Sequence, residues 1–335
     1  MTDTLNIGID VGGTKIELGL VDQNGVIVSR QRRPTPGDAE TDPYDAFLVL
    51  LGAMIDHAAH EAGLGAHSPV GLCIPGALDA ANGQVKNSNR VWMNGRSLQA
   101  DLESRIGRKT VFANDGACFA LSETMDGSAV GTQVVFGVVL GTGVGGGLVL
   151  DRQVWNGRHG ISGEWGHNPF PVRDRSDIDR LEAELGEIPR CFCGQTLCVE
   201  TVLRGQALAA RYEVLSGRAA SGAELASLIK DQDLLALKAL QRYGGDLARA
   251  LSVVVNLVDP DVIVLGGGLS DNDALLPIVN RCLPDMVFHT GPAKTRPAPR
   301  VLGNRWGGAS GLRGAAWMAR QLTQSDNASD HVLSK

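Results

Sequence analysis

The sequence predicts an α/β protein made of two related halves, and three observations lead to this fold class. Segments with the alternating pattern of strands are interleaved with segments of helical periodicity. A strand, a glycine-rich turn and a second strand occur together twice, at residues 5–21 and again at 134–150. The chain has 335 residues, which is long for one domain and suits two. Two copies of one unit imply two facing lobes with a ligand cleft between them.

The periodicity also gives expected elements. Strands are expected at 5–10, 16–21, 26–30, 70–74, 110–113, 134–140, 148–150 and 262–265. Helices are expected at 43–63, 98–106, 115–124, 205–215, 222–230, 234–258 and 309–321. These elements divide into an N-terminal α/β lobe at 1–125, to which part of the last helix is added, and a C-terminal α/β lobe at 126–320. The polar residues at 321–335 are expected to be disordered.

The composition narrows the classes of function. The net charge is -6 and the pI is about 5.7, so the chain lacks the basic footprint of a nucleic-acid binder. The N-terminus shows no signal-peptide pattern, and no apolar run is long enough to cross a bilayer. We therefore expect a cytoplasmic protein with no membrane partner.

Three cysteines and one histidine form a candidate metal site. Cys191, Cys193 and Cys198 lie within eight residues and follow His167 in the chain. Together they make a full set of ligands for one tetrahedral Zn²⁺ ion. The alternative is three buried or disulfide-bonded cysteines, but a disulfide cannot use three thiols and the chain looks cytosolic. A metal here would draw together Glu164 and Glu200, and its removal is expected to loosen the ligand pocket beside it first.

Three glycine-rich turns are candidate phosphate sites. A turn between two strands can point backbone N–H groups outward, which suits phosphate oxygens. Asp10, at the end of the first strand, could hold Mg²⁺ through water. The alternatives are a plain β-hairpin turn for the first site and a strand-to-helix turn for the third. The residues concerned are Asp10, Gly12, Gly13, Thr14 and Lys15 in the first turn, Gly141, Thr142 and Gly143 in the second, and Gly266, Gly267 and Gly268 in the third.

The second of these turns matches the dinucleotide fingerprint G-x-G-x-x-G. That fingerprint requires a following helix, whereas Leu148–Leu150 has the pattern of a strand. A nicotinamide site is therefore rejected, and a second phosphate turn remains.

Two further segments carry polar side chains suited to a sugar substrate. Asn114 and Asp115 join a strand to a helix, which by itself favours a helix N-cap, but Asp115 could also be a general base. The segment from Asn87 to Gly95 contains Asn89 and Trp92, and amides beside an indole ring suit a polyol. A turn-rich loop is the alternative for this segment.

Taken together, these motifs resemble the ROK family of sugar kinases, and within it the fructokinase and mannokinase branch. The resemblance extends from about Ile7 to Trp317. Residues 85–95 and 163–169 carry the likeness to that branch. The motifs are D-x-G-G-T-K at 10–15, A-N-D at 113–115, L-G-T-G-x-G-G-G at 140–147, G-E-W-G-H at 163–167 and C-x-C-G-x-x-x-C-x-E at 191–200.

The resemblance implies an actin-like ATPase (ribonuclease H-like) fold. ATP would bind the three glycine-rich turns, and Asp115 would be the catalytic base that accepts the proton of the sugar 6-hydroxyl. The sugar would be held by Asn89, Asn114, Asp115, Glu164, His167 and Glu200, and a structural zinc ion by His167, Cys191, Cys193 and Cys198. A homodimer is expected from the resemblance alone.

The expected activity is ATP-dependent phosphorylation of D-fructose, with D-mannose as a further substrate. A kinase for glucose or N-acetylglucosamine is the first alternative. A sugar-sensing regulator is the second, but it would need a DNA-binding segment before the first strand.

Three positions depart from the family pattern. They are Leu197 in place of a glycine before the last cysteine, Ala117 in place of an asparagine after the base, and Trp306-Gly-Gly308 in place of His-Gly-Asp. The first puts only the conformation of the cysteine loop in doubt.

Overall fold

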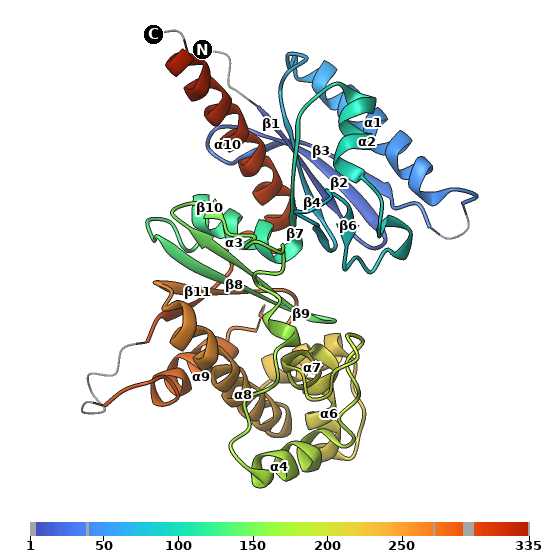
Figure 1. The fold of residues 1–335 in the computed structure, drawn as a ribbon. Coiled ribbons are helices and arrows are strands. Elements are labelled where there is room, and N and C mark those ends of the chain that lie inside the picture. The colour runs from blue at the N-terminus through green and yellow to red at the C-terminus, as the bar shows by residue number, and fades with distance from the viewer. Residues whose placement is uncertain (1–4, 38–39, 271, 291–297, 334–335) are drawn as a thin grey trace. The chain divides into compact units, whose positions relative to one another are not determined.

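The computed structural model describes residues 5–37, 40–270, 272–290 and 298–333, with side chains as far as residue 325. The chain forms two compact units (Figure 1). The first comprises Met1–Val130, Gly147–Ser162 and Gly308–Lys335. The second comprises Gly131–Gly146 and Gly163–Gly307. Within the described residues, no helix combines the length and the apolar character needed to cross a membrane.

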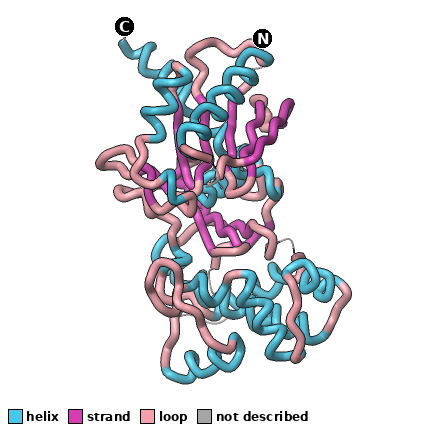
Figure 2. The backbone as a smooth tube through the Cα atoms, turned by 90° about the vertical axis from the view of Figure 1, so that its right-hand side faces the viewer, coloured by secondary structure: helices cyan, strands magenta, loops and turns pink. Residues whose placement is uncertain are grey.

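The first unit is built on a five-stranded sheet with the order β3-β2-β1-β4-β7. β1, β4 and β7 are parallel, β2 pairs antiparallel with β1, and β3 pairs antiparallel with β2. Figure 2 separates these strands, in magenta, from the helices in cyan. The elements are β1 (Asn6–Val11), β2 (Lys15–Val21), β3 (Ile27–Pro34), α1 (Pro43–Glu61), β4 (Val70–Ile74), β5 (Ala77–Leu78), β6 (Val85–Lys86), the 3-10 turn η1 (Val91–Met93), α2 (Leu98–Ile106), β7 (Thr110–Asn114), α3 (Asp115–Asp126), β10 (Gln153–Val154) and α10 (Ser310–Leu333).

The two faces of this sheet are packed differently. Because side chains alternate along a strand, Ile7 and Ile9 of β1 share one face, where they join a buried core with Phe47 of α1. The other face carries Gly8, which pairs with a glycine on each neighbouring strand. A Cβ atom on Gly71 of β4 would stand 1.7 Å from the carbonyl oxygen of Ala315. The missing side chains therefore let α10 lie directly against the sheet.

We expect Gly71→Ala to lower the free energy of unfolding by about 3 kcal/mol, because the added methyl group collides with the backbone of α10 and neither can move aside cheaply. Urea denaturation followed by circular dichroism measures the change. Gly65→Ala is the matched control, since a Cβ atom there meets nothing within 4 Å. Equal stability of the two variants would contradict the close packing of α10.

The second unit contains the parallel strands β8, β11 and β12, which belong to a sheet with the order β10-β9-β8-β11-β12. Gly266 at the end of β11 pairs with Val139 near the end of β8, so the turns that follow these strands emerge side by side. The elements that lie wholly or partly in this unit are β8 (Val134–Leu140), β9 (Val144–Leu150), η2 (Trp165–His167), α4 (Arg175–Leu185), α5 (Val199–Leu203), α6 (Gly205–Ser216), α7 (Gly222–Lys230), α8 (Leu234–Val258), β11 (Val262–Gly266), α9 (Leu275–Cys282), η3 (Leu283–Asp285), β12 (Arg300–Gly303) and η5 (Gly307–Ala309).

Several elements differ from the sequence prediction. β9 begins at Val144, within the stretch expected to be a turn, because Gly146 lies so close to β8 that a side chain would meet the carbonyl of Gly137. α10 continues to Leu333 and so includes residues expected to be disordered, since no glycine or proline interrupts it after Gly314. The helices α4, α5 and α9 and the strand β12 were not expected.

Candidate functional site

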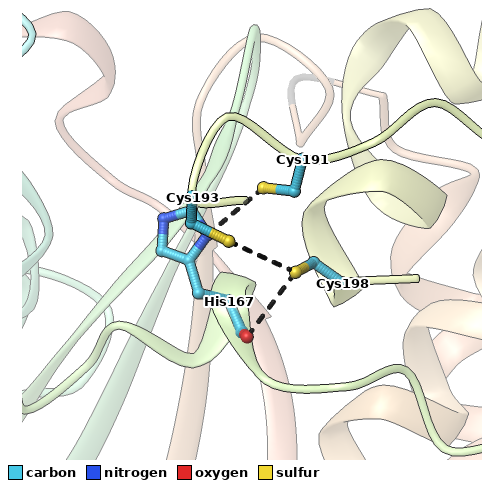
Figure 3. Close-up of side chains that lie close together, drawn as sticks. All are labelled: His167, Cys191, Cys193 and Cys198. Atoms are coloured by element: carbon cyan, nitrogen blue, oxygen red, sulfur yellow. Dashed lines mark hydrogen bonds between the residues drawn. The ribbon is translucent and has the colours of Figure 1, made fainter. Parts of the chain in front are cut away.

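Four side chains with soft ligand atoms converge in the second unit. His167 ends η2, Cys191 and Cys193 lie between α4 and α5, and Cys198 directly precedes α5. Their ligand atoms all lie within 4.8 Å of one another. His167 Nδ1 is 3.5 Å from Cys191 Sγ, and Cys193 Sγ is 3.6 Å from Cys198 Sγ (Figure 3). Metal–ligand bonds of about 2.1–2.3 Å place the ligands of a tetrahedral zinc ion about 3.5–3.8 Å apart, so these two distances match those of a zinc site.

The loop that carries the cysteines contains two left-handed residues. Gly194 has a φ of 89°, and the turn around it is closed by the N–H of Cys191, which donates to Gln195 O at 3.0 Å. Leu197 has a φ of 53°, a conformation that favours glycine. Leu197 therefore replaces the family's glycine at a position where the backbone is left-handed, and it adds strain to the loop.

We expect Leu197→Gly to stabilise the protein by about 0.5–1 kcal/mol, because relief of left-handed strain exceeds the added flexibility of the unfolded chain. The same change should slow the loss of bound zinc to a chelator. Gln232→Gly is the matched control, since Gln232 has a φ of 62° and lies outside the cysteine loop. The control should raise the melting temperature without altering zinc retention. Faster zinc loss from the Leu197 variant would contradict this account.

Two carboxylates lie beside the cysteine–histidine cluster. Glu200, in the first turn of α5, is 8% exposed, and its Oε2 accepts a hydrogen bond from Val144 N at 3.0 Å. Glu164 Oε2 is 4.0 Å from His167 Nε2, the ring nitrogen on the side away from Cys191. Glu200 is therefore positioned by the chain segment that carries Cys198, and Glu164 lies beside the imidazole ring of His167.

Glu200 also shapes the glycine-rich turn after β8. A Cβ atom on Gly143 would stand 2.7 Å from Glu200 Oε2, so a side chain there would displace the carboxylate. Gly205 N donates to Gly141 O at 2.8 Å. Trp165, beside His167, donates from Nε1 to Gly145 O at 2.9 Å. The segments that carry the metal ligands thus also hold this turn in place. Sequence reasoning missed this connection because the contacting residues are far apart in the chain.

The turn after β11 lies next to the same region. Gly267 has a φ of 83°, and a Cβ atom there would stand 2.3 Å from Leu140 O. Leu269 N donates to that carbonyl oxygen at 3.2 Å. The structure therefore brings residues 266–268 beside residues 141–143, two of the three turns predicted to bind phosphates.

The first turn and the predicted base lie in the first unit. Asp10 stands near the carboxyl end of β1, and Asp115 begins α3 directly after β7. Burial, together with a smaller contribution from the nearby carboxylate of Asp115, raises the pKa of Asp10 to about 6. The side chain of Asp115 reaches solvent, but the surrounding protein partly desolvates its carboxylate and so raises its pKa. The hydrogen bond from Gly116 N acts in the opposite direction and is the weaker effect. Both groups are therefore poised nearer to neutral pH than ordinary aspartates.

The first turn itself offers fewer donors than expected. Gly12 N donates to Lys15 O at 2.9 Å, so this N–H closes the turn and does not point outward. Lys15 Nζ is 2.7 Å from Glu17 Oε1, and its side chain is half-exposed. The side chain of Thr14 is exposed. Gly13, Thr14 and Lys15 remain the candidate phosphate contacts.

The asparagines of the first unit have distinct surroundings. Asn114 Oδ1 accepts from Ala117 N at 2.7 Å, so Asn114 is the N-cap of α3, as the alternative interpretation expected. Asn89 is exposed, and the residue before it is clamped by Asn94, whose side chain makes two 2.9 Å hydrogen bonds with the backbone of Ser88. Arg90 donates to Gly13 O. The asparagine-rich loop is therefore attached to the first phosphate turn.

The structure thus gathers the predicted residues into two groups. Asn89, Asn114, Asp115 and the Asp10–Lys15 turn belong to the first unit. Glu164, His167, Glu200, the cysteines and the other two turns belong to the second. Sequence reasoning missed the supporting roles of Arg90, Asn94 and Trp165, although all three lie in segments whose composition drew attention.

Comparison with known proteins gives consistent results. The model of the ROK family matches residues 6–322. The chain is 36% identical over 311 residues to N-acetyl-D-glucosamine kinases from Shigella flexneri serotype 5b and from Escherichia coli O7:K1, covering 93% of this chain and 98% of each relative.

Solved structures are also similar. The ROK hexokinase from Thermus thermophilus has a TM-score of 0.76 and 29% identity, covering 96% of this chain and 100% of that one. A ROK family glucokinase from Streptomyces griseus in complex with glucose and AMPPNP has a TM-score of 0.72 and 26% identity, covering 95% and 100%. The actin-like ATPase fold predicted from the sequence is confirmed.

Proposed function

The chain belongs to the ROK family of sugar kinases, and from this premise we propose that it transfers the γ-phosphoryl group of ATP to the 6-hydroxyl of a hexose, with Asp115 as the general base. The observation that carries the proposal is the place of Asp115, an accessible carboxylate of raised pKa at the start of α3, where β7 ends. A base with a pKa nearer to neutral accepts a proton more effectively than an ordinary aspartate.

The proposed step is a phosphoryl transfer in which the carboxylate of Asp115 accepts a proton. The hydroxyl oxygen forms a bond to the γ-phosphorus, the bond from that phosphorus to the bridging oxygen breaks, and ADP leaves. The hydroxyl proton passes to an Asp115 carboxylate oxygen. Mg²⁺, when bound with the nucleotide, neutralises phosphate charge. Asp10, a half-buried carboxylate beside Asp115, is suited to hold that ion through water.

The nucleotide phosphates would lie on the three glycine-rich turns. Gly13, Thr14 and Lys15 supply the first, residues 141–143 the second and residues 266–268 the third. The adjacency of the second and third turns supports this part of the proposal, because it brings two glycine-rich segments of backbone close together.

The sugar would be held by Asn89, Asn114, Glu164, His167 and Glu200. Since Asn114 Oδ1 caps α3, its contribution is the Nδ2 donor. Carboxylates and amides suit sugar hydroxyls because each can bridge two neighbouring groups.

A structural zinc ion fits the cluster of His167, Cys191, Cys193 and Cys198, and its part in the enzyme is to order the segment that delivers Glu200. It supplies no step of the reaction. The thiols need a reducing compartment such as the cytoplasm to stay available for metal.

The preferred sugar is N-acetyl-D-glucosamine on the strength of the curated relatives. D-Fructose is the second candidate, because residues 85–95 and 163–169 resemble the fructokinase and mannokinase branch. The hydrogen bonds between Asn94 and Ser88 give the first of these segments a defined shape, so residues of this segment would determine which sugar is preferred.

ADP release measured on N-acetyl-D-glucosamine, D-fructose, D-mannose and D-glucose tests the proposal. We expect one of the first two sugars to exceed the others at least tenfold in kcat/KM. Turnover of fructose alone would assign the chain to the second candidate. No ADP release on any of the four sugars would overturn the kinase proposal.

The pH dependence follows from the raised pKa of Asp115. The base works only when deprotonated, so kcat/KM should fall as the pH drops through the pKa of the folded protein. That pKa lies above the ordinary aspartate value of about 4. A pH–rate profile between pH 4 and pH 9 measures the acidic limb. A limb that lies at or below the ordinary value would contradict the assignment.

A further inference from the structure

A cavity of about 310 Å³ lies in the first unit, apart from the residues assigned above. Its walls come from the turn between β2 and β3, the end of α3, the turn before β10 and the outer part of α10 (Figure 1). α3 begins at Asp115 and ends at Asp126, which lines the cavity, so its 12 residues separate the two by about 16–18 Å. The volume is at the lower end of the range for small-molecule sites.

The charge lining this cavity is positive. Asp126 is paired with Arg313, and Trp317 Nε1 donates to it at 3.1 Å, so its charge is already matched. Arg152 and Arg320 lie on the cavity wall, and neither comes within salt-bridge distance of a carboxylate in the part of the chain that the structure describes. Two guanidinium groups without a counter-charge favour an anionic ligand.

Arg320 is held in position by its surroundings. Its guanidinium carbon lies 5.0 Å from the Trp317 ring centroid, and one nitrogen donates to Gln23 O at 2.6 Å. A guanidinium has five N–H donors, so most of them stay available for a ligand. The group is therefore ordered before any anion binds.

Arg152 occupies a conformation that glycine would adopt more easily. Leu150 pairs with Gln153, so Asp151 and Arg152 form a two-residue hairpin turn with φ angles of 48° and 66°. Glycine is the usual residue in the second position of such a turn. Gln321 Nε2 donates to Arg152 O at 2.6 Å and fixes the turn over the cavity. Strain of this kind is retained where the side chain has a use.

Neutral groups on the same walls suit hydroxyls. The amides of Asn24 and Gln321 and the indole ring of Trp317 line the cavity with the two arginines. We propose that this cavity binds a small phosphorylated sugar, with Arg152 and Arg320 on the phosphate and the amides on the hydroxyls. The choice of a sugar phosphate rests on the proposed function, whose product it is, whereas the anion site stands on the arginines alone.

Isothermal titration calorimetry of the full chain with glucose 6-phosphate, inorganic phosphate and glucose tests this site. Arg152→Gly and Arg320→Gln should each weaken one bound glucose 6-phosphate per chain at least tenfold. Arg152→Gly should also keep or raise the melting temperature, because glycine relieves the left-handed strain of the hairpin turn. A loss of binding in this variant therefore cannot be attributed to a loss of folding. Arg281→Gln, an exposed arginine of α9, is the matched control and should bind as the wild type does.

The outcomes separate the possibilities. Binding of glucose 6-phosphate that both arginine variants leave unchanged, or no binding at millimolar concentration, would overturn the site. Inorganic phosphate that binds as tightly as glucose 6-phosphate would overturn the sugar part and leave a phosphate site. Loss of binding in both variants with full kinase activity retained would show that the cavity and the catalytic residues are separate. Binding without any kinase activity would overturn the proposed function alone.

Discussion

Asp115→Asn should lower kcat by a factor of about 10²–10⁴ and change KM for the sugar less than threefold, because only the acceptance of the hydroxyl proton is lost. The amide oxygen of asparagine can still accept the hydrogen bond from Gly116 N that the carboxylate accepts at 2.9 Å, so α3 should begin as before. Steady-state kinetics with a coupled ADP assay measure both constants.

Asp45→Asn is the matched control for this variant. Asp45 lies in the first turn of α1, as Asp115 lies in the first turn of α3, and pairs with Arg105 at 3.2 Å on the surface. The control should keep its kcat, and both variants should keep their melting temperatures. A kcat within twofold of the wild type for Asp115→Asn would remove the residue from the mechanism.

Cys198→Ala should release one zinc ion per chain and abolish measurable turnover. A structural zinc site contributes on the order of 10 kcal/mol to the order of its surroundings. Glu200 follows Cys198 by two residues and bonds Val144 N, so its displacement should disturb the turn at residues 141–146 as well as the sugar contacts. Affinity for the nucleotide and for the sugar should therefore fall together, measured by calorimetry beside metal analysis.

This expectation differs from the one drawn from the sequence, that metal loss would loosen the sugar pocket first. The physical reason is the hydrogen bond between Glu200 and Val144, which no spacing in the sequence reveals. Cys282→Ala, a half-buried cysteine outside the cluster, is the control and should keep its metal. Nucleotide affinity that survives metal loss intact would contradict the coupling, and freshly purified protein without zinc would contradict the site.

The residues that sequence analysis placed best are those fixed by local pattern. α8 begins and ends at the predicted residues because an uninterrupted apolar stripe follows the N-cap Asp233 and stops at the left-handed Asp259. The spacing of the three cysteines predicted a cluster, and the structure places all of them with His167 around one point. The family was identified correctly from motifs spread along most of the chain.

The features that were missed depend on contacts between distant segments. Gly8, Gly19 and Gly71 are unremarkable in sequence, and only the sheet register shows that they share one face. α4 was missed although Asp174 caps it through Ser176 N and Asp177 N, because four of its eleven residues are buried and two of those are acidic. Asp177 is held by Arg249, and such an ion pair is invisible until the fold is known.

The packing of α10 against those three glycines has a consequence for how the protein folds during its synthesis on the ribosome. The first 130 residues emerge early, yet the helix that covers one face of their sheet is translated after residue 309. A contact spanning more than 200 residues is slow to form and leaves apolar surface open meanwhile. The N-terminal sheet must therefore wait for nearly the whole chain before it can close, and it is during this interval that a nascent chain would most need a chaperone.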